Sequence, residues 1–189
     1  MAINPSLTTI PNLLTYGRIV AIPVIVLLVV LGDPALRWLA LILYIAAAIS
    51  DFFDGYLARR WNQSSPLGRM LDPIADKLLV AALIVTFAWD RSFAAWDLIP
   101  ALAILMREIL VSGLREFLGP RNVVVKVTQL AKWKTTVQLL ALTFVFLAPL
   151  LAGAGLVAEL LLWLAGAMTI ITGVQYFQGA WPHLSGELE

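Results

Sequence analysis

Apolar segments about as long as a bilayer is thick account for most of this sequence. Hydrophobic residues occupy 61% of the 189 positions and charged residues 13%, and a water-soluble domain of this size could not bury so much apolar surface. A membrane-spanning helix needs about 20 consecutive, mainly apolar residues. We therefore predict an all-α, polytopic membrane protein that forms a single domain over residues 1–189.

Six segments are long and apolar enough to be transmembrane helices, and turns that contain glycine or proline separate several of them. The predicted spans cover residues 13–31, 36–58, 71–89, 96–118, 130–149 and 156–177. The segment at the start of the chain, INPSLTTIPNLL, contains two prolines and several residues that commonly cap helices. We expect it to form a short interfacial helix along the lipid headgroups.

Basic residues predict the orientation of the spans, because lysine and arginine near span ends are retained on the cytoplasmic side. The loop between the second and third spans contains Arg59, Arg60 and Arg69. The loop between the fourth and fifth spans is equally basic, whereas the opposite side offers only Arg37 and Arg91. We therefore expect both termini and both basic loops on the cytoplasmic side of a bacterial cytoplasmic membrane.

Overall charge and composition exclude several kinds of partner and site. The formal net charge is +1, which gives no electrostatic support for a nucleic-acid partner. The sequence contains no cysteine, so disulfides and thiolate metal sites are excluded. A bound metal ion would have to be held by oxygen atoms or by the single histidine, His183.

Four aspartates at one edge of the predicted membrane domain are the main candidates for chemistry. Asp51 and Asp54 are separated by three positions near the end of the second span, and Asp72 and Asp76 by four positions at the start of the third. On helices, each pair projects from one face. The short connecting loop makes the two helices antiparallel neighbours, so we expect all four carboxylates to converge at one membrane depth.

Carboxylates in this position need positive charge beside them. An ionised aspartate at the centre of a transmembrane helix costs at least about 2.5 to 3.5 kcal/mol, and close carboxylates repel one another in a low dielectric. Mg²⁺ and Mn²⁺ bind carboxylates while leaving positions for phosphate oxygens, and four acids favour two such ions. The alternative is that the aspartates cap helix ends and pair with nearby basic residues: Arg59, Arg60, Arg69 and Lys77.

Small and polar residues near the aspartates predict a phosphorylated ligand. Gly55, Ala58 and Gly68 would let such a ligand approach the backbone, although close helix packing also selects small residues in membranes. Arg59 is assigned to a diphosphate, because its guanidinium forks toward phosphate oxygens. Three residues at the start of the first span are candidates for contact with the nucleotide or diphosphate: Asn12, Thr15 and Arg18. Helix capping is the alternative for Asn12 and Thr15.

The residues from Asp51 to Asp76 read D-x2-D-G-x2-A-R-x8-G-x3-D-x3-D, and this pattern resembles, without departure, the signature of the CDP-alcohol phosphatidyltransferase family. Members of that family are integral membrane enzymes with six helices that are usually homodimers. The resemblance implies that Asp51, Asp54 and Asp72 bind two divalent cations and that Asp76 is both ligand and catalytic base. It also implies that the CDP portion is accommodated by the remaining signature residues: Gly55, Ala58, Arg59 and Gly68.

Segments outside the signature resemble the branch of this family that uses glycerol phosphate. They are PNLLTYGRI at 11–19, REILVSGLREF at 107–117 and KWKTTVQ at 132–138. The implied reaction transfers the phosphatidyl group of CDP-diacylglycerol to sn-glycerol 3-phosphate, giving phosphatidylglycerophosphate and CMP. Phosphatidylglycerol and inositol phosphate are alternative acceptors. A cation transporter is the alternative from another class, but the paired repeats typical of transporters are missing.

A phosphorylated acceptor would need cations besides the metal ions. Arg107 and Glu108 lie in the middle of the predicted fourth span, where an ionisable residue is a functional candidate by default. We expect Arg107, Arg115, Lys132 and Lys134 to bind the acceptor phosphate, with Glu108 as an orienting partner. The alternative is that these cations snorkel to the interface and set the topology.

Overall fold

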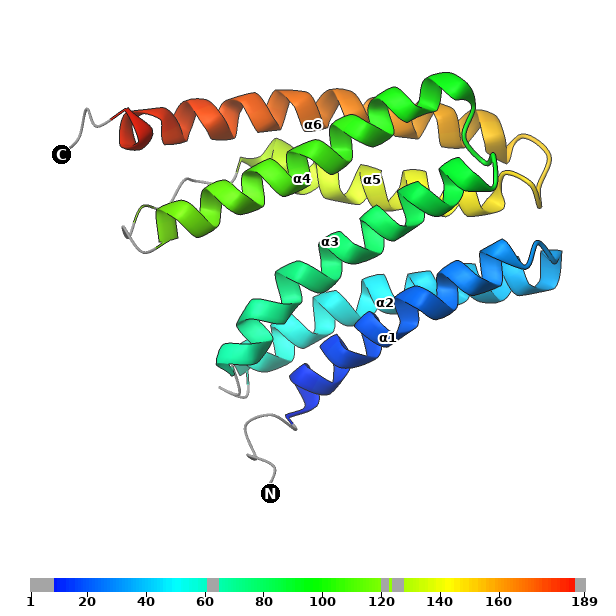
Figure 1. Cartoon of the computed structure of the whole chain (residues 1–189), viewed down its shortest axis with the longest axis horizontal. Helices are drawn as coiled ribbons and strands as arrows, with labels where there is room; N and C mark the ends of the chain where they lie inside the picture. The colour runs from blue at the N-terminus through cyan, green and yellow to red at the C-terminus, as the bar shows by residue number, and fades with distance from the viewer. Residues whose placement is uncertain (1–8, 61–64, 120–122, 124–127, 186–189) are drawn as a thin grey trace. The chain divides into compact units, whose positions relative to one another are not determined.

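Helices account for all regular secondary structure in the part of the chain that this computed structural model describes, which is residues 9–60, 65–119, 123 and 128–185 (Figure 1). The side chains of residues 52, 54–59 and 69 are also outside this description. The elements are α1 (Ile10–Val30), α2 (Pro34–Arg60), α3 (Pro66–Trp89), the short 3-10 helix η2 (Ala95–Asp97), α4 (Leu98–Leu118), α5 (Gln129–Leu147) and α6 (Ala154–Leu184). The prediction of an all-α protein is confirmed.

Each predicted span corresponds to one long helix, and the differences lie at the helix ends. Helix α3 begins at Pro66 rather than at residue 71, because Ser65 accepts a hydrogen bond from the backbone N–H of Gly68 and Pro66 occupies the first turn. Helix α6 continues to Leu184, beyond the predicted end at residue 177, and includes Pro182. The apolar runs used for prediction mark the membrane-embedded part of a helix rather than its full length.

Four of the helices in the described part of the chain are long and apolar enough to cross a membrane: α1, the part of α2 from Pro34 to Asp51, α5 and α6. Large apolar side chains on these helices are strongly exposed, as Val20, Ile42 and Leu160 illustrate, which suits contact with lipid rather than water. The finding supports an integral membrane protein. Of the predicted interfacial segment, residues 3–14, the first six lie outside the described residues, and residues 10–14 form the start of α1.

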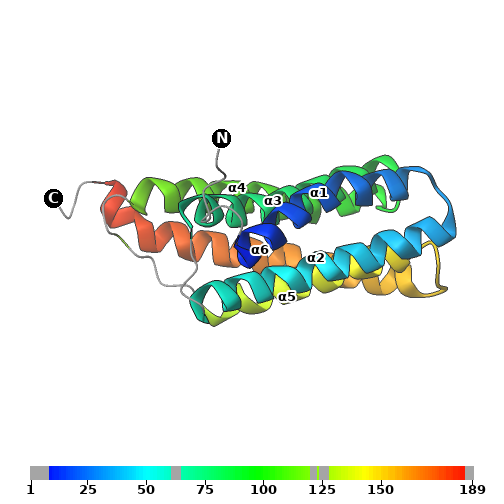
Figure 2. The ribbon, with the colours of Figure 1, turned by 90° about the horizontal axis from the view of Figure 1, so that it is seen from below.

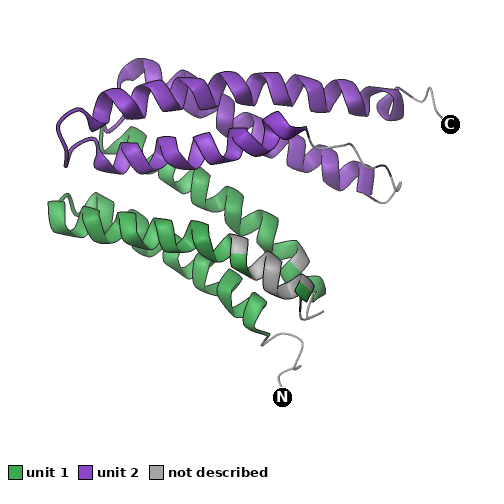
Figure 3. Ribbon diagram, turned by 180° about the vertical axis from the view of Figure 1, so that it is seen from behind, with its two compact units in different colours: residues 1–91 green, residues 92–189 purple. Residues whose placement is uncertain are grey.

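The helices form two compact units, Met1–Arg91 and Ser92–Glu189 (Figure 3). In the first unit, α1 packs against both α2 and α3, and in the second, α6 packs against both α4 and α5 (Figures 1 and 2). One helix is therefore the common packing partner within each unit. The single domain predicted over residues 1–189 stays a prediction.

One face of α1 is buried along the helix, and its character changes from polar to apolar. The buried residues are spaced by three or four positions, as expected for one helix face: Asn12, Thr15, Arg18, Ile22, Ile25 and Val29. The second half of this face packs as an ordinary apolar core. The first half inserts polar side chains between α2 and α3, and their hydrogen bonds determine how the three helices fit together.

Close packing in the second unit depends on a glycine in α6. A Cβ atom at Gly166 would lie 2.6 Å from the Cβ and 3.0 Å from the Cα of Pro100 in α4. Such a distance would force the two backbones apart, so Gly166 permits α4 and α6 to approach closely. Small residues commonly have this role between membrane helices, where dispersion and close contact replace the hydrophobic effect.

An ion pair joins the start of α2 to the end of α3 in the first unit. Nη1 of Arg37 lies 2.6 Å from Oδ2 of Asp90, the residue that caps the C-terminus of α3, and the two side chains are only 10% and 11% exposed. The guanidinium also lies 5.7 Å from the centroid of the Phe87 ring. This contact closes the end of the unit opposite to Asp51 and Asp72.

We predict that Arg37→Met lowers the stability of the purified protein in detergent, because the Asp90 carboxylate loses this ion pair in a largely buried position. Breaking a buried pair costs about 3–5 kcal/mol, whereas replacing both partners by apolar residues is often nearly neutral. The double variant Arg37→Met/Asp90→Leu should therefore unfold at a higher temperature than either single variant. A melting temperature of the double variant that falls by the sum of the two single losses would contradict this account.

Candidate functional site

The position of the aspartates on α3 depends on how this helix begins. Ser65 donates a hydrogen bond from its hydroxyl to Oδ1 of Asn12 in α1 at 2.9 Å, while its Oγ accepts from the N–H of Gly68 at 2.9 Å. All three residues are buried. The start of α3 is thereby attached to α1, and Asp72 and Asp76 follow on the next turns of the helix.

Gly68 has a packing role in this arrangement. A Cβ atom at this position would clash with Oδ1 of Asn12 and would lie 3.1 Å from Oγ of Ser65. Any larger residue would therefore displace the bond that attaches the cap of α3 to α1. The predicted role of Gly68 in accommodating CDP stays a prediction beside this structural one.

Two polar residues of α1 bind one aspartate each. The hydroxyl of Thr15 donates to Oδ1 of Asp72 at 2.6 Å, and Nη1 of Arg18 donates to Oδ1 of Asp51 at 2.5 Å. Thr15 and Arg18 are both buried and lie three positions apart on one helix face. Helix α1 therefore brings an aspartate from the end of α2 and one from the start of α3 to the same short segment.

The structure says less about the other two aspartates, Asp54 and Asp76. Asp76 lies one helical turn beyond Asp72 on α3 and is partly buried, which keeps the two carboxylates on one helix face. The side chains of Asp54, Gly55, Ala58 and Arg59 are outside the described residues, so the convergence of all four carboxylates stays a prediction. Nζ of Lys77, one of the basic residues considered as partners of the aspartates, donates to the backbone oxygen of Pro73 at 2.7 Å.

The donor atoms near α1 suit a hard cation. Asp51 and Asp72 each use Oδ1 for the bond to α1, and the side chain of Asp51 is still 46% exposed. Carboxylate oxygens are the ligands that Mg²⁺ and Mn²⁺ prefer. The described side chains, which do not include that of Asp54, contain no group of three or more acidic or histidine residues arranged around a metal position.

Glu108 is the centre of a second polar cluster, on α4 and α5. Its Oε1 accepts a hydrogen bond from Nζ of Lys134 and lies 3.3 Å from Nη1 of Arg107. Lys134 is only 2% exposed, and its Nζ also lies 3.2 Å from Oε1 of Gln138. A buried ammonium group requires such partners. Glu108 therefore neutralises Lys134, and its orienting role toward an acceptor stays a prediction.

The predicted cations are not equivalent in the structure. Nε of Arg107 is buried and has no hydrogen-bond partner among the described residues. Arg115 is exposed, and its guanidinium lies 5.3 Å from the centroid of the Tyr176 ring in α6. Lys132 is exposed in the first turn of α5. Lys134 is thus the cation of the set that is buried against a carboxylate, whereas Arg115 and Lys132 are exposed.

A small polar cavity in the second unit brings Arg107 and Arg115 together. Its volume is about 20 Å³, and its lining also includes residues that the sequence analysis did not select: Thr128, Ala131, Thr172, Gln175 and Tyr176. None of the site residues predicted from the sequence lies in the last span, residues 156–177. Three polar residues close together in that span, Thr172, Gln175 and Tyr176, were the signal that could have identified it.

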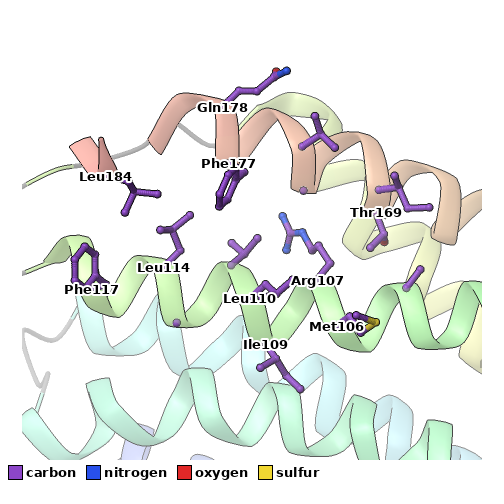
Figure 4. A pocket seen from close by; sticks show the side chains of 16 residues that line it. Met106, Arg107, Ile109, Leu110, Leu114, Phe117, Thr169, Phe177, Gln178 and Leu184 are labelled. Carbon is purple, nitrogen blue, oxygen red and sulfur yellow. The ribbon is translucent and has the colours of Figure 1, made fainter. Parts of the chain in front are cut away.

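A larger groove between α4 and α6 is mainly apolar. Its volume is about 920 Å³, and Met106, Leu110 and Phe177 are among the side chains that line it (Figure 4). Arg107 points from α4 toward α6 at one part of this groove, where Thr169 also lies (Figure 4). In a membrane protein a groove with this lining suits lipid chains rather than polar chemistry.

Known proteins resemble this chain over nearly its whole length. Residues 8–171 match the family described as CDP-alcohol phosphatidyltransferase. A protein from Cereibacter sphaeroides named CDP-diacylglycerol--glycerol-3-phosphate 3-phosphatidyltransferase is 41% identical, over 95% of this chain and 98% of its own. Proteins with the same name from Rickettsia bellii and Shigella flexneri are 48% and 38% identical, over 89% and 90% of this chain and 93% and 94% of theirs. The family predicted from the aspartate signature is therefore confirmed, and the chain belongs to the CDP-alcohol phosphatidyltransferase family.

Proposed function

We propose that this protein transfers the phosphatidyl group of CDP-diacylglycerol to sn-glycerol 3-phosphate, releasing CMP. The observation that carries the proposal is that relatives named for this activity are 41% and 48% identical over most of both chains. The complete aspartate signature from Asp51 to Asp76 supports the same chemistry. The product would be phosphatidylglycerophosphate, a precursor of anionic phospholipids.

The proposed membrane topology has six spans, with both termini and the polar sites on the cytoplasmic side of a bacterial cytoplasmic membrane. Helices α3 and α4 contain 24 and 21 residues, which at about 1.5 Å per residue is enough to cross a hydrocarbon core of about 30 Å. The acidic residues of α3 lie near its start, and Glu108 of α4 is paired with Lys134. Both features lower the cost of placing charged residues in a span.

We assign the first unit to the metal ions and the CDP portion. Asp51, Asp54, Asp72 and Asp76 would bind two divalent cations, Mg²⁺ or Mn²⁺, which would neutralise charge on the diphosphate. Thr15 and Arg18 orient Asp72 and Asp51 through the bonds described above, while Asn12 holds the start of α3. Arg59, with Gly55, Ala58 and Gly68 of the signature, would accommodate the nucleotide.

The proposed reaction is a direct displacement at phosphorus. The primary hydroxyl oxygen of glycerol 3-phosphate forms a bond to the lipid-side phosphorus, and the bond from that phosphorus to the oxygen of CMP breaks. Asp76 accepts the hydroxyl proton as general base. Its position one turn from Asp72, on the same face of α3, places a base beside a proposed metal ligand.

We assign the second unit to the phosphate of the acceptor. Arg107 and Arg115 would bind it, because both line the small polar cavity and guanidinium groups match phosphate oxygens. Lys134 would act indirectly, because the Glu108 carboxylate pairs with both Lys134 and Arg107. Lys132 would add positive charge at the start of α5.

We also propose that the protein acts as a homodimer in the bilayer and has no nucleic-acid partner.

Purified protein should release CMP from CDP-diacylglycerol when glycerol 3-phosphate is the acceptor. We expect little CMP release with inositol phosphate, phosphatidylglycerol or serine, because the segments outside the signature resemble the branch of the family that uses glycerol phosphate. Chelation with EDTA should abolish the reaction, and Mg²⁺ or Mn²⁺ should restore it. Faster CMP release with another acceptor, or no lipid product at all, would overturn the proposed function.

Asp72→Asn and Asp76→Asn should each lower kcat by about 100-fold or more, because the first loses a metal ligand and the second the general base. Both substitutions preserve side-chain shape, so the melting temperature should change little. Glu159→Gln, at an exposed position of α6, is the matched control and should keep wild-type kcat. Equal activity in all three variants would remove the aspartates from the mechanism.

Arg107→Gln and Arg115→Gln should raise the KM for glycerol 3-phosphate about 10- to 100-fold, since hydrogen bonds to a charged group contribute about 1.5–3 kcal/mol. The KM for CDP-diacylglycerol should stay near the wild-type value. Arg91→Gln, an exposed position outside the proposed site, controls for the loss of one positive charge. A KM for glycerol 3-phosphate that does not change in either variant would refute this assignment.

A further inference from the structure

We propose that α6 completes the acceptor-phosphate site by positioning the guanidinium groups of Arg107 and Arg115, with Gly173 and Tyr176 as the positioning residues. This inference rests on the proposed function and adds a helix that the sequence analysis left without a role.

Gly173 provides the space that Arg107 needs. A Cβ atom at Gly173 would lie 3.1 Å from Cγ of Arg107, which is closer than ordinary van der Waals contact. The aliphatic stem of Arg107 therefore passes directly over the backbone of α6, and its guanidinium points from α4 toward that helix (Figure 4). An alanine at this position would push the stem away and change where the guanidinium lies.

Arg107 has hydrogen-bonding capacity left for a ligand. Its Nε is buried without a partner among the described residues, and its Nη1 makes only a long contact of 3.3 Å with Glu108. A buried donor without a partner costs about 1–3 kcal/mol. An anion that accepted a hydrogen bond from Nε of Arg107 would remove this penalty.

Tyr176 restrains the second arginine. Its ring is only 8% exposed, and the guanidinium of Arg115 lies 5.3 Å from the ring centroid. Arg115 is itself exposed and would otherwise sample many rotamers. The cation–π contact restricts those rotamers, and less conformational entropy is then lost when Arg115 binds phosphate.

The two contacts lie on matching faces. Arg107 and Arg115 are separated by eight residues, about two helical turns, and Gly173 and Tyr176 by three residues, so each pair shares one face of its helix. Both arginines line one cavity, and Thr128, Thr172 and Gln175 line it too. Thr128 and Gln175 are within 3.5 Å of each other, which connects the start of α5 to α6.

The chemistry of this cavity fits the oxygens of a phosphate monoester. Two arginines, two threonines, a glutamine and a tyrosine are among the residues that line it, and none of the described residues that line it is acidic. Its volume of about 20 Å³ holds about one water-sized group, so one phosphate oxygen would enter while the rest of the phosphate stays outside. Glu108 pairs with both Arg107 and Lys134, but of these two cations only Arg107 lines this cavity.

Steady-state kinetics of Tyr176→Leu and Tyr176→Phe tests the positioning role of the ring. Tyr176→Leu should raise the KM for glycerol 3-phosphate about 3- to 10-fold, the loss expected for one cation–π contact, with kcat and the KM for CDP-diacylglycerol within about twofold of wild type. Tyr176→Phe keeps the ring and should restore the wild-type KM. A purely structural role would instead change both KM values and the melting temperature together.

Gly173→Ala tests the second contact, with Gly113→Ala in α4 as the matched control. A Cβ atom at Gly113 has no atom within 4 Å, so this variant should keep both KM values. Gly173→Ala should raise the KM for glycerol 3-phosphate alone. Wild-type kinetics in both Gly173→Ala and Tyr176→Leu would overturn the inference.

Direct binding separates this inference from the proposed function. The dissociation constant for sn-glycerol 3-phosphate, measured by calorimetry on protein in detergent, should rise in Tyr176→Leu and Gly173→Ala but not in Tyr176→Phe. If the dissociation constants follow this pattern but the wild type transfers no phosphatidyl group to glycerol 3-phosphate, the proposed function fails and the positioning role stands. If the wild type turns over glycerol 3-phosphate and the variants bind it equally well, only the positioning role fails.

Discussion

The two bonds that α1 makes to aspartates of its neighbours are the constraint on which the rest of the first unit depends. Thr15 binds Asp72 of α3 and Arg18 binds Asp51 of α2. Both α1 residues are buried, and a buried hydroxyl or guanidinium without an acceptor is costly. Helix α1 therefore packs in a register that satisfies both side chains, and the same register brings the two carboxylates to one segment.

In the second unit, too, buried charged groups need partners, but there a carboxylate pairs with cations of two helices. Glu108 lies between Arg107 and Lys134, so the buried ammonium group is neutralised inside the helix bundle. Arg115 lies over an aromatic ring instead of a carboxylate. The pairing pattern thus separates Lys134, which is buried against a carboxylate, from Arg115, which is exposed beside an aromatic ring, and sequence position alone does not distinguish the two.

Much of the helical arrangement could be predicted, because a bilayer requires about 20 apolar residues per span and turns between spans contain glycine or proline. The ends of the helices could not be predicted in this way. Helix α3, for example, begins at Pro66, after the capping residue Ser65, and both residues precede its apolar run. Among the candidate residues, spacing indicated that Asp72 and Asp76 share a face. It did not reveal the bond between Ser65 and Asn12 or the contact between Tyr176 and Arg115, because those partners lie far apart in the sequence.

The sequence by itself determined the family, the all-α class and the aspartate pattern, because periodicity, hydropathy and motif spacing are local properties of the chain. The tertiary structure alone decided which side chain satisfies which charge: Arg18 with Asp51, Thr15 with Asp72, and Lys134 with Glu108. It also decided that Gly68 and Gly173 provide space for Asn12 and Arg107. These pairings depend on how closely two helices approach each other. The packing of whole helix faces determines that distance, and a local sequence pattern does not encode it.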